Sequence, residues 1–145
     1  MTDIKIRKAK KTDFEEIIRL IKGFSEFIGT PEKVKITACD MKSELFHCLV
    51  AENNQGVIIG YVTYFFAFYS WIGKSLYLDY LYVIDSFRGC KVGSKLLDEV
   101  IEIALTSDCK KVRWQVSNWN TKAIEFYKKR GANIDTTEIN CDLIL

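Results

Sequence analysis

The segment Asp85–Lys95 reads Asp-Ser-Phe-Arg-Gly-Cys-Lys-Val-Gly-Ser-Lys, a basic run with two glycines between a predicted strand and a predicted helix. Free N–H groups and the positive dipole end at a helix start bind phosphate oxygens, and glycine lets an anion approach the backbone closely. The spacing GxxxxGK[ST] of a Walker A loop is not present. The segment is therefore a candidate phosphate-binding loop, although Gly89 and Gly93 could equally serve only a tight turn.

A second candidate segment, Asn118–Tyr127, begins a predicted helix. Asn120 is a suitable helix N-cap, which by itself explains an asparagine at this position. Tyr127 lies about two turns later, where its hydroxyl could donate a proton or simply meet solvent.

Three further side chains could take part in chemistry. Asp79, on the strand before the loop, could be a general base or a solvated strand residue. His47 is expected to be structural, because no acid or serine partner is visible by motif. Cys90 is interpreted as a loop residue open to oxidation rather than as a nucleophile.

Hydrophobic periodicity predicts the elements that position these residues. In the strand Leu76–Ile84, strict alternation puts one set of residues (Leu76, Leu78, Tyr80, Tyr82) opposite another (Tyr77, Asp79, Leu81, Val83). The order βααβββαβαβ indicates an α/β fold in which helices flank a mixed, mostly antiparallel central sheet, as one domain over residues 1–145. Predicted strands cover Ile4–Arg7, Phe46–Glu52, Val57–Tyr69, Leu76–Ile84, Lys111–Val116 and Ile134–Leu145; predicted helices start at Thr12 or Asp13, run from Thr37 to about Leu45, and cover Ser94–Ser107 and Asn120–Arg130.

Composition excludes several classes of function. A net charge of +2 with mixed signs and a pI of about 8.2 disfavour a nucleic-acid partner. Five cysteines without a CxxC pair suggest reduced thiols in a cytoplasmic protein, and a single histidine disfavours a zinc site or other metal centre. We expect neither a signal peptide nor a membrane span.

Together the two segments resemble the GNAT family of N-acetyltransferases, which use acetyl-CoA. The family pattern Arg/Gln-x-x-Gly-x-Gly/Ala matches Arg88 and Gly93, and Asn-x-x-Ala-x-x-Phe-Tyr matches Asn120, Ala123 and Phe126-Tyr127. Stretches 46–52, 71–78 and 126–132 are most similar to the diamine (spermidine/spermine) and thialysine acetyltransferases. The resemblance covers nearly the whole chain and implies a GNAT-like fold.

The resemblance also implies a set of acetyl-CoA contacts. The backbone at Leu81 and Val83 should meet the pantetheine arm, and the N–H near Tyr82 should polarise the thioester carbonyl. Tyr127 should approach the sulfur. The remaining expected cofactor-binding residues are Arg88, Gly89, Cys90, Lys91, Val92, Gly93, Ser94, Asn120 and Ala123.

The chemistry of amide formation gives two of these residues a role. An alkyl amine with a pKa near 10.4 is almost wholly protonated at pH 7, so the site must remove a proton before the amine can attack. Asp79 fits a base acting through water. The leaving thiolate needs a proton in turn, and the Tyr127 hydroxyl fits that donor.

The chain departs from the family at two places. Lys91 stands at the central glycine of the loop, where it could crowd the diphosphate or pair with a phosphate. On the acceptor side, subgroup acids are replaced at Ile28, Tyr69 and Tyr80, which argues against a polycation. Expected acceptor-binding residues are therefore Asp79 and four aromatic residues: Phe27, Tyr69, Trp71 and Tyr80.

These observations favour an N-acetyltransferase that moves the acetyl group of acetyl-CoA to a primary amine of a small molecule by direct transfer in a ternary complex. The alternatives are a polyamine or protein-lysine acetyltransferase and a non-catalytic CoA-binding sensor. The resemblance also implies a homodimer.

Overall fold

The computed structural model describes residues 3–145, which divide into two compact units, one ending at Trp114 and the other running from Gln115 to Leu145. The single domain predicted over residues 1–145 stays a prediction. Each unit is described by itself below.

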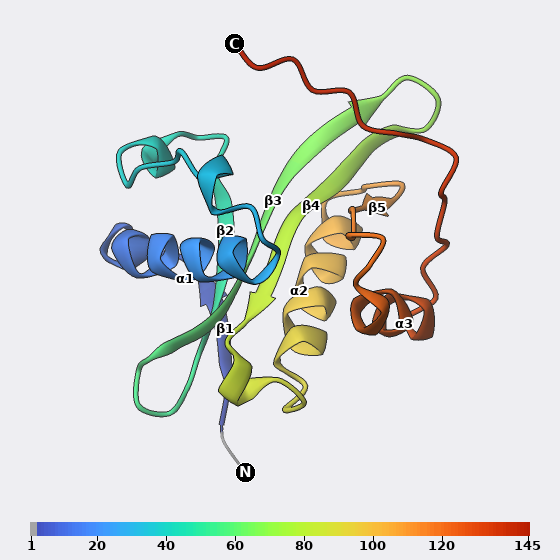
Figure 1. The fold of residues 1–145 in the computed structure, drawn as a ribbon. Helices are drawn as coiled ribbons and strands as arrows, with labels where there is room; N and C mark the ends of the chain where they lie inside the picture. The colour runs from blue at the N-terminus through green and yellow to red at the C-terminus, as the bar shows by residue number, and fades with distance from the viewer. Residues whose placement is uncertain (1–2) are drawn as a thin grey trace. The chain divides into compact units, whose positions relative to one another are not determined.

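The first unit is built on a five-stranded sheet in the order β1-β2-β3-β4-β5 (Figure 1). The first four strands pair antiparallel, and β4 and β5 pair parallel. The predicted mixed, mostly antiparallel sheet flanked by helices is therefore confirmed. The strands are β1 (Lys5–Lys8), β2 (His47–Glu52), β3 (Ile58–Tyr69), β4 (Gly73–Val83) and β5 (Val112–Arg113), and the α-helices of this unit are α1 (Phe14–Phe27) and α2 (Val92–Thr106).

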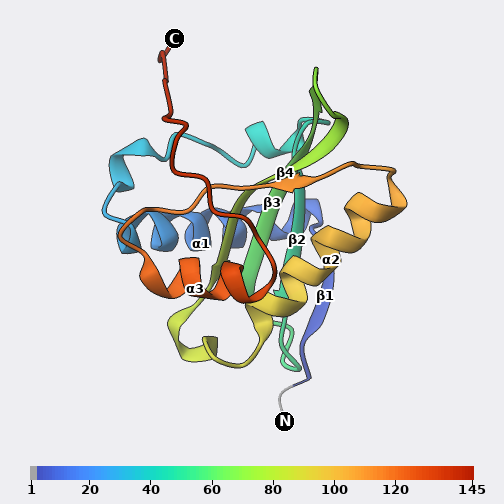
Figure 2. The same ribbon diagram turned by 90° about the vertical axis from the view of Figure 1, so that its right-hand side faces the viewer.

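The two helices cover opposite faces of the sheet (Figures 1 and 2). Apolar residues of α1, led by Ile17, form a core cluster with Val50 and Tyr61. On the other face, Gly60 brings β3 close to Leu96 of α2. A Cβ at Gly60 would lie 2.8 Å from the carbonyl oxygen of Tyr82, so this position requires glycine.

A β-bulge in β4 breaks the predicted alternation. Thr63 of β3 pairs with Tyr80, but the next residue, Tyr64, pairs with Leu78, so Asp79 is the extra residue. Because paired residues share a face and β3 keeps its period of two, Leu78 shares a face with Leu81 rather than with Tyr80. The prediction that Leu76, Leu78, Tyr80 and Tyr82 share one face is therefore wrong beyond the bulge.

The predicted helix Thr37–Leu45 is only a 3₁₀ turn, Asp40–Lys42. Its capping interaction does form, since the Thr37 N–H donates to Asp40 Oδ2 at 2.7 Å. The turn ends where Ser43 becomes extended, and only Met41 within the turn is buried. Too few apolar side chains anchor this segment for a helix to propagate.

The last two predicted strands are also shorter or absent. Of Lys111–Val116, only Val112–Arg113 pairs with β4. No strand forms between Ile134 and Leu145 in the described chain. There the Asp135 carboxylate accepts hydrogen bonds from the backbone and hydroxyl of Thr137, a local turn that competes with strand pairing.

The second unit contains α3 (Thr121–Lys129). Asn120 caps this helix, because its side-chain oxygen accepts the Ala123 N–H at 3.3 Å. The helix ends at Lys129, and the chain turns at Gly131, where φ is +88° and the next N–H, of Ala132, donates back to the Tyr127 carbonyl at 3.1 Å.

Candidate active site

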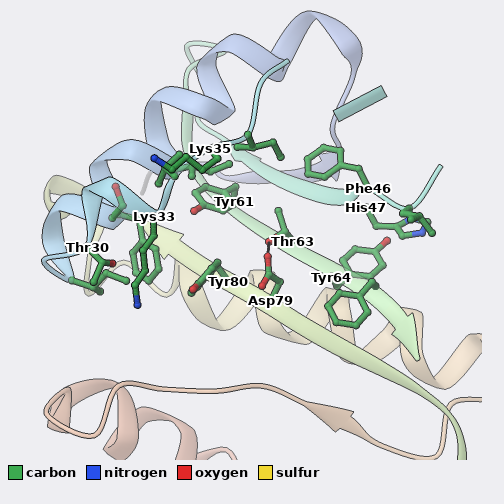
Figure 3. Close-up of a pocket in the computed structure, with 18 residues that line it drawn as sticks. Thr30, Lys33, Lys35, Phe46, His47, Tyr61, Thr63, Tyr64, Asp79 and Tyr80 are labelled. Carbon is green, nitrogen blue, oxygen red and sulfur yellow. Dashed lines mark hydrogen bonds between the residues drawn. The ribbon is translucent and has the colours of Figure 1, made fainter. Parts of the chain in front are cut away.

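A cavity of about 430 Å³ opens on the α1 face of the sheet (Figure 3). Its walls are the end of α1, the following segment from Ile28 to Ile36, the start of β2, and the central parts of β3 and β4. This volume lies in the usual range for a small-molecule site. Most of the lining side chains are apolar or aromatic: Ile21, Phe24, Ile28, Val34, Ile36, Leu45, Phe46, Tyr61, Tyr64, Phe65 and Tyr80.

Asp79 is held at the bulge of β4 and lines this cavity together with Tyr80 (Figure 3). The hydroxyl of Thr63 donates a hydrogen bond to Asp79 Oδ2 at 3.3 Å. Part of Asp79 remains open to solvent, yet the cavity walls withdraw enough water to raise the pKa of its carboxyl, and the bond from Thr63 works in the opposite direction. A carboxylate with a raised pKa is better able to accept a proton near neutral pH.

Charge is distributed unevenly in the cavity. Asp79 is the only acid among the described lining residues, whereas Lys33 and Lys35 both contribute to the wall. The nearby acids Glu26 and Glu32 are exposed and do not line it. The described lining thus offers one carboxylate that could pair with an ammonium group, and the side chains of both lysines are exposed.

The structure separates the residues predicted to hold the acceptor. Asp79 and Tyr80 line the cavity. Phe27 does not line the cavity and stacks on Phe24, which does, with ring centroids 6.5 Å apart. Tyr69 and Trp71 lie at the far end of the β3–β4 hairpin, where Trp71 is fully exposed, and neither lines the cavity.

Sequence reasoning missed several lining residues, among them Thr63 and His47. His47 stacks on Tyr64 with centroids 5.3 Å apart. Thr63 could have been found only by aligning β3 with β4 across the bulge, which strict alternation does not predict.

The predicted phosphate loop lies between a 3₁₀ turn, Asp85–Phe87, and the start of α2. Gly89 has a φ of +82°, and Lys91, the N-cap of α2, has a φ of +61°. Both are left-handed, which glycine adopts freely and lysine does not. The first N–H groups of α2 have no carbonyl partner within the helix, and here they follow a basic, exposed loop.

Arg88 ties this loop to two other elements. Its Nε donates to the Val83 carbonyl at 3.0 Å, and its Nη1 pairs with Asp85 at 2.6 Å. Its guanidinium lies 4.5 Å from the ring centroid of Phe27, the last residue of α1, and 5.6 Å from that of Tyr82. Arg88 thus bridges the loop, β4 and the helix that walls the cavity.

The end of β4 presents backbone groups away from β3. The Ile84 N–H bonds to Ile59 at 3.0 Å, so alternation makes Leu81 and Val83 face the opposite side. The described part of β5 pairs with β4 only at Leu76 and Tyr77, which leaves the later residues of that edge without a strand partner.

The predicted residues Asn120, Ala123 and Tyr127 all belong to α3 and its cap. Tyr127 is buried, and this burial raises the pKa of its phenol, so the hydroxyl keeps its proton at neutral pH. Its ring lies 5.3 Å from that of Phe126.

Residues 13–132 match the acetyltransferase (GNAT) family. The chain belongs to the GNAT acetyltransferase family. It is 36% identical to a thialysine N-epsilon-acetyltransferase of Mus musculus over 151 residues, covering 95% of this chain and 88% of the mouse protein. It is 33% identical to the spermidine/spermine N(1)-acetyltransferase-like protein 1 of Homo sapiens, covering 91% of this chain and 21% of that protein.

Further similarities agree with the family. The chain is 30% identical to the L-ornithine N5-acetyltransferase of Arabidopsis thaliana over 112 residues, which is 77% of this chain and 48% of the plant protein. The crystal structure of the aminoglycoside N-acetyltransferase AAC(6′)-Iy in complex with CoA superposes with a TM-score of 0.78 at 19% identity, over 99% of this chain and 96% of that one. The predicted family, fold and enzyme class, an acetyl-CoA-dependent N-acetyltransferase, are confirmed.

The loop of this GNAT enzyme fits an extended anionic cofactor such as acetyl-CoA. A Cβ built at Gly89 would meet no protein atom within 4 Å, so the space beside the loop is open. Arg88, Lys91 and Lys95 supply positive charge around it, and the free edge of β4 offers N–H and C=O groups for amides.

Two other kinds of feature are absent from the described residues. Within residues 3–145, no helix is long and apolar enough to cross a membrane. Over the same residues, no group of three or more His, Cys, Asp or Glu side chains could hold a metal ion.

Proposed function

We propose that this GNAT enzyme acetylates the primary amine of a small molecule by direct transfer in a ternary complex, with Asp79 as the general base. The observation that carries the proposal is Asp79 itself: a bulge aims a carboxylate of raised pKa into a mostly apolar cavity of small-molecule size. A group able to accept a proton is what a protonated amine requires before it can attack.

Acetyl-CoA, when bound, supplies an acetyl group activated as a thioester. Backbone groups of Leu81 and Val83 and the loop from Arg88 to Ser94 would hold it, with Tyr82 contributing its N–H. Asn120 and Ala123 would lie on the cofactor side, as the family resemblance implies. The Tyr127 hydroxyl holds the proton that the leaving sulfur needs, which suits a phenol whose pKa is raised.

The cavity disfavours a polyamine or a protein lysine as the main acceptor. A polycation needs several carboxylates, and the described lining offers only Asp79. The aromatic wall suits a compact amine with an apolar body. Two of the relatives, named for thialysine and ornithine, support a small amine acceptor, whereas a third is named for spermidine/spermine.

We further propose a cytoplasmic homodimer. All five cysteines are free, and two of them, Cys39 and Cys90, are exposed in the first unit, which suits a reducing compartment. Exposed aromatic residues on the β3–β4 hairpin, including Phe68 and Trp71, suit a subunit interface. Sedimentation equilibrium of wild type and of the Phe68→Ser/Trp71→Ser variant tests the dimer, which the double substitution should dissociate.

A thiol-release assay over a panel of amines tests the proposed function. Turnover of a small primary amine, with much weaker turnover of spermidine, is the expected result. Acetyl-CoA binding by calorimetry without turnover of any amine would instead support a CoA-binding sensor. Tyr127→Phe should lower kcat by about 10² or more while acetyl-CoA still binds, and an unchanged kcat would remove Tyr127 from the mechanism.

A further inference from the structure

A buried phenol in the cavity wall carries a hydroxyl that the proposed acetyl transfer does not use. Tyr61 of β3 is only 1% exposed, its ring belongs to the core cluster beneath α1, and it lines the cavity beside Thr63 (Figure 3). No hydrogen bond joins its hydroxyl to any of the described residues. Since no fully buried side-chain oxygen of these residues lacks a partner, the Tyr61 oxygen is accessible, and the cavity is the space that it borders.

Other buried hydroxyls of the wall are already occupied. Thr63 donates to Asp79 at 3.3 Å, and Ser25 donates to a backbone carbonyl of α1 at 2.7 Å. Among the described residues, the hydroxyls of Tyr61 and Tyr64 have no such partner. A polar group surrounded by apolar side chains costs free energy unless it is hydrogen-bonded, and folded proteins pair nearly all of them. An unpaired phenol on a cavity wall therefore indicates a partner that enters the cavity.

Strand geometry places Tyr61 close to the proposed base. Tyr61 and Thr63 are two residues apart on β3, so their side chains share a face at a spacing of about 7 Å, and Thr63 is bonded to Asp79. Burial chiefly, and the carboxylate of Asp79 among smaller influences, raise the pKa of the Tyr61 phenol, so the hydroxyl keeps its proton. Tyr61 can thus donate and accept a hydrogen bond, but it cannot act as a base at neutral pH.

The surroundings of Tyr61 favour an uncharged partner. A carboxylate there would meet the same negative charge of Asp79 that disfavours the phenolate. A second ammonium would find no acid of its own, because Asp79 is the only acid among the described lining residues. A hydroxyl or an amide can pair with a phenol and brings no charge into the mostly apolar wall.

We propose that Tyr61 determines acceptor specificity: its hydroxyl binds an uncharged hydroxyl or amide group of an acceptor whose primary amine faces Asp79. The inference rests on the proposed function, because it assigns a second contact within the same cavity. The ring is fixed by the core, so the direction of the hydroxyl is fixed as well. Tyr61 transfers no proton, and its contribution is to acceptor binding.

Three matched series of amines isolate this contact. Straight-chain primary amines of three to six carbons are compared without a further group, with a terminal hydroxyl and with a terminal amide. An amine that lacks the polar group leaves the Tyr61 hydroxyl unpaired, so we expect kcat/KM to be at least about tenfold higher for the best polar amine than for the plain amine of the same length. Equal values in all three series, or a preference for the plain amines, would overturn the inference and leave the proposed acetyl transfer intact.

Tyr61→Phe assigns the preference to one oxygen atom, because it removes the hydroxyl and keeps the ring. The variant should lose the preference through a higher KM for the polar amines, with kcat for the plain amines unchanged. Tyr77→Phe is the matched control, since Tyr77 also lies on the sheet but does not line the cavity. If Tyr61→Phe lowers kcat equally for every amine, or if only Tyr64→Phe abolishes the preference, Tyr61 is not the group that recognises the acceptor.

Two further measurements keep the test independent of turnover. Calorimetric titration of the best polar amine and its plain partner into the CoA-loaded protein should show tighter binding of the polar amine in wild type but not in Tyr61→Phe. Because the hydroxyl has no described partner in the protein, the variant should melt no lower than wild type, and a marked drop would overturn the inference. If no amine is acetylated while the binding preference persists, the proposed function fails and the contact with Tyr61 stands.

Discussion

The proposed phosphate loop and the proposed acceptor cavity belong to the same unit of the chain but are built in different ways. The loop consists of consecutive residues, 85–95, and we propose that it binds through backbone groups, whose directions depend on local φ angles. The cavity gathers side chains from α1, the segment after it and three strands, and its chemistry centres on one carboxylate. A site that depends on one side chain is vulnerable to one substitution, whereas a site that depends on several backbone groups loses its function gradually.

Asp79→Asn tests the cavity side of this contrast and should have the largest effect. Loss of the general base should lower kcat/KM by about 10² to 10⁴ with little change in acetyl-CoA binding. Because the raised pKa shows that the folded protein disfavours this charge, the variant should melt no lower than wild type at pH 7. Glu32→Gln, an exposed acid outside the cavity, is the control, and an equal loss there would contradict the assignment.

The pH profile should sharpen the same point. Protonation of Asp79 removes the base, so kcat/KM should fall about tenfold per unit below its pKa, starting at a higher pH than for an ordinary carboxyl. Thr63→Val removes a hydrogen bond that favours the carboxylate and should move this acid limb to still higher pH. Thr106→Val is the control, because the Thr106 hydroxyl donates to carbonyl groups within α2, and this variant should leave the acid limb in place. If Thr63→Val does not move the acid limb, the group that titrates is not Asp79.

Arg88→Lys tests whether the two regions are coupled. Lysine cannot reproduce both the bond to Val83 and the stacking on two rings, so unfolding free energy should fall by about 1–2 kcal/mol. Since Arg88 bridges the loop and α1, KM should rise several-fold for acetyl-CoA and for the amine together. Arg113→Lys, which loses only its contact with Tyr69, is the control. A rise in the KM of acetyl-CoA alone would mean that the two regions act independently.

Lys91→Gly should have the smallest effect. A left-handed conformation costs a lysine roughly 1–2 kcal/mol, and the greater freedom of glycine in the unfolded chain offsets about half of this, so stability should rise by about 1 kcal/mol or less. Loss of the exposed ammonium should weaken acetyl-CoA binding about two- to fivefold at low salt. Calorimetry measures the affinity for acetyl-CoA, and thermal melting measures the stability of the variant. Markedly tighter binding of acetyl-CoA by Lys91→Gly would show that the lysine side chain crowds the cofactor.

The same contrast explains what could be predicted from the chain. The loop, the Asn120 cap and the meander of β2, β3 and β4 are encoded by neighbouring residues, and all three were predictable. The residues of the acceptor wall were only partly predictable. Tyr80 lines the cavity, but Tyr69 and Trp71, which were also predicted to bind the acceptor, lie at the far end of a long hairpin. Strand alternation contains no signal for the bulge, because a bulge depends on how two strands pair.

Asp79 is the extra residue of β4 and has no pairing partner in β3, so the pairing of the two strands does not depend on it. Exchanging the side chain there alters reactivity and leaves the strand as it is. Deleting the position would leave a regular ladder in which Thr63 still pairs with Tyr80 and Tyr64 with Leu78, so the later residues of β4 would keep their faces and the carboxylate alone would be lost. Over evolutionary time, descendants of this enzyme can therefore exchange or lose the residue at position 79 while the rest of the sheet is inherited unchanged.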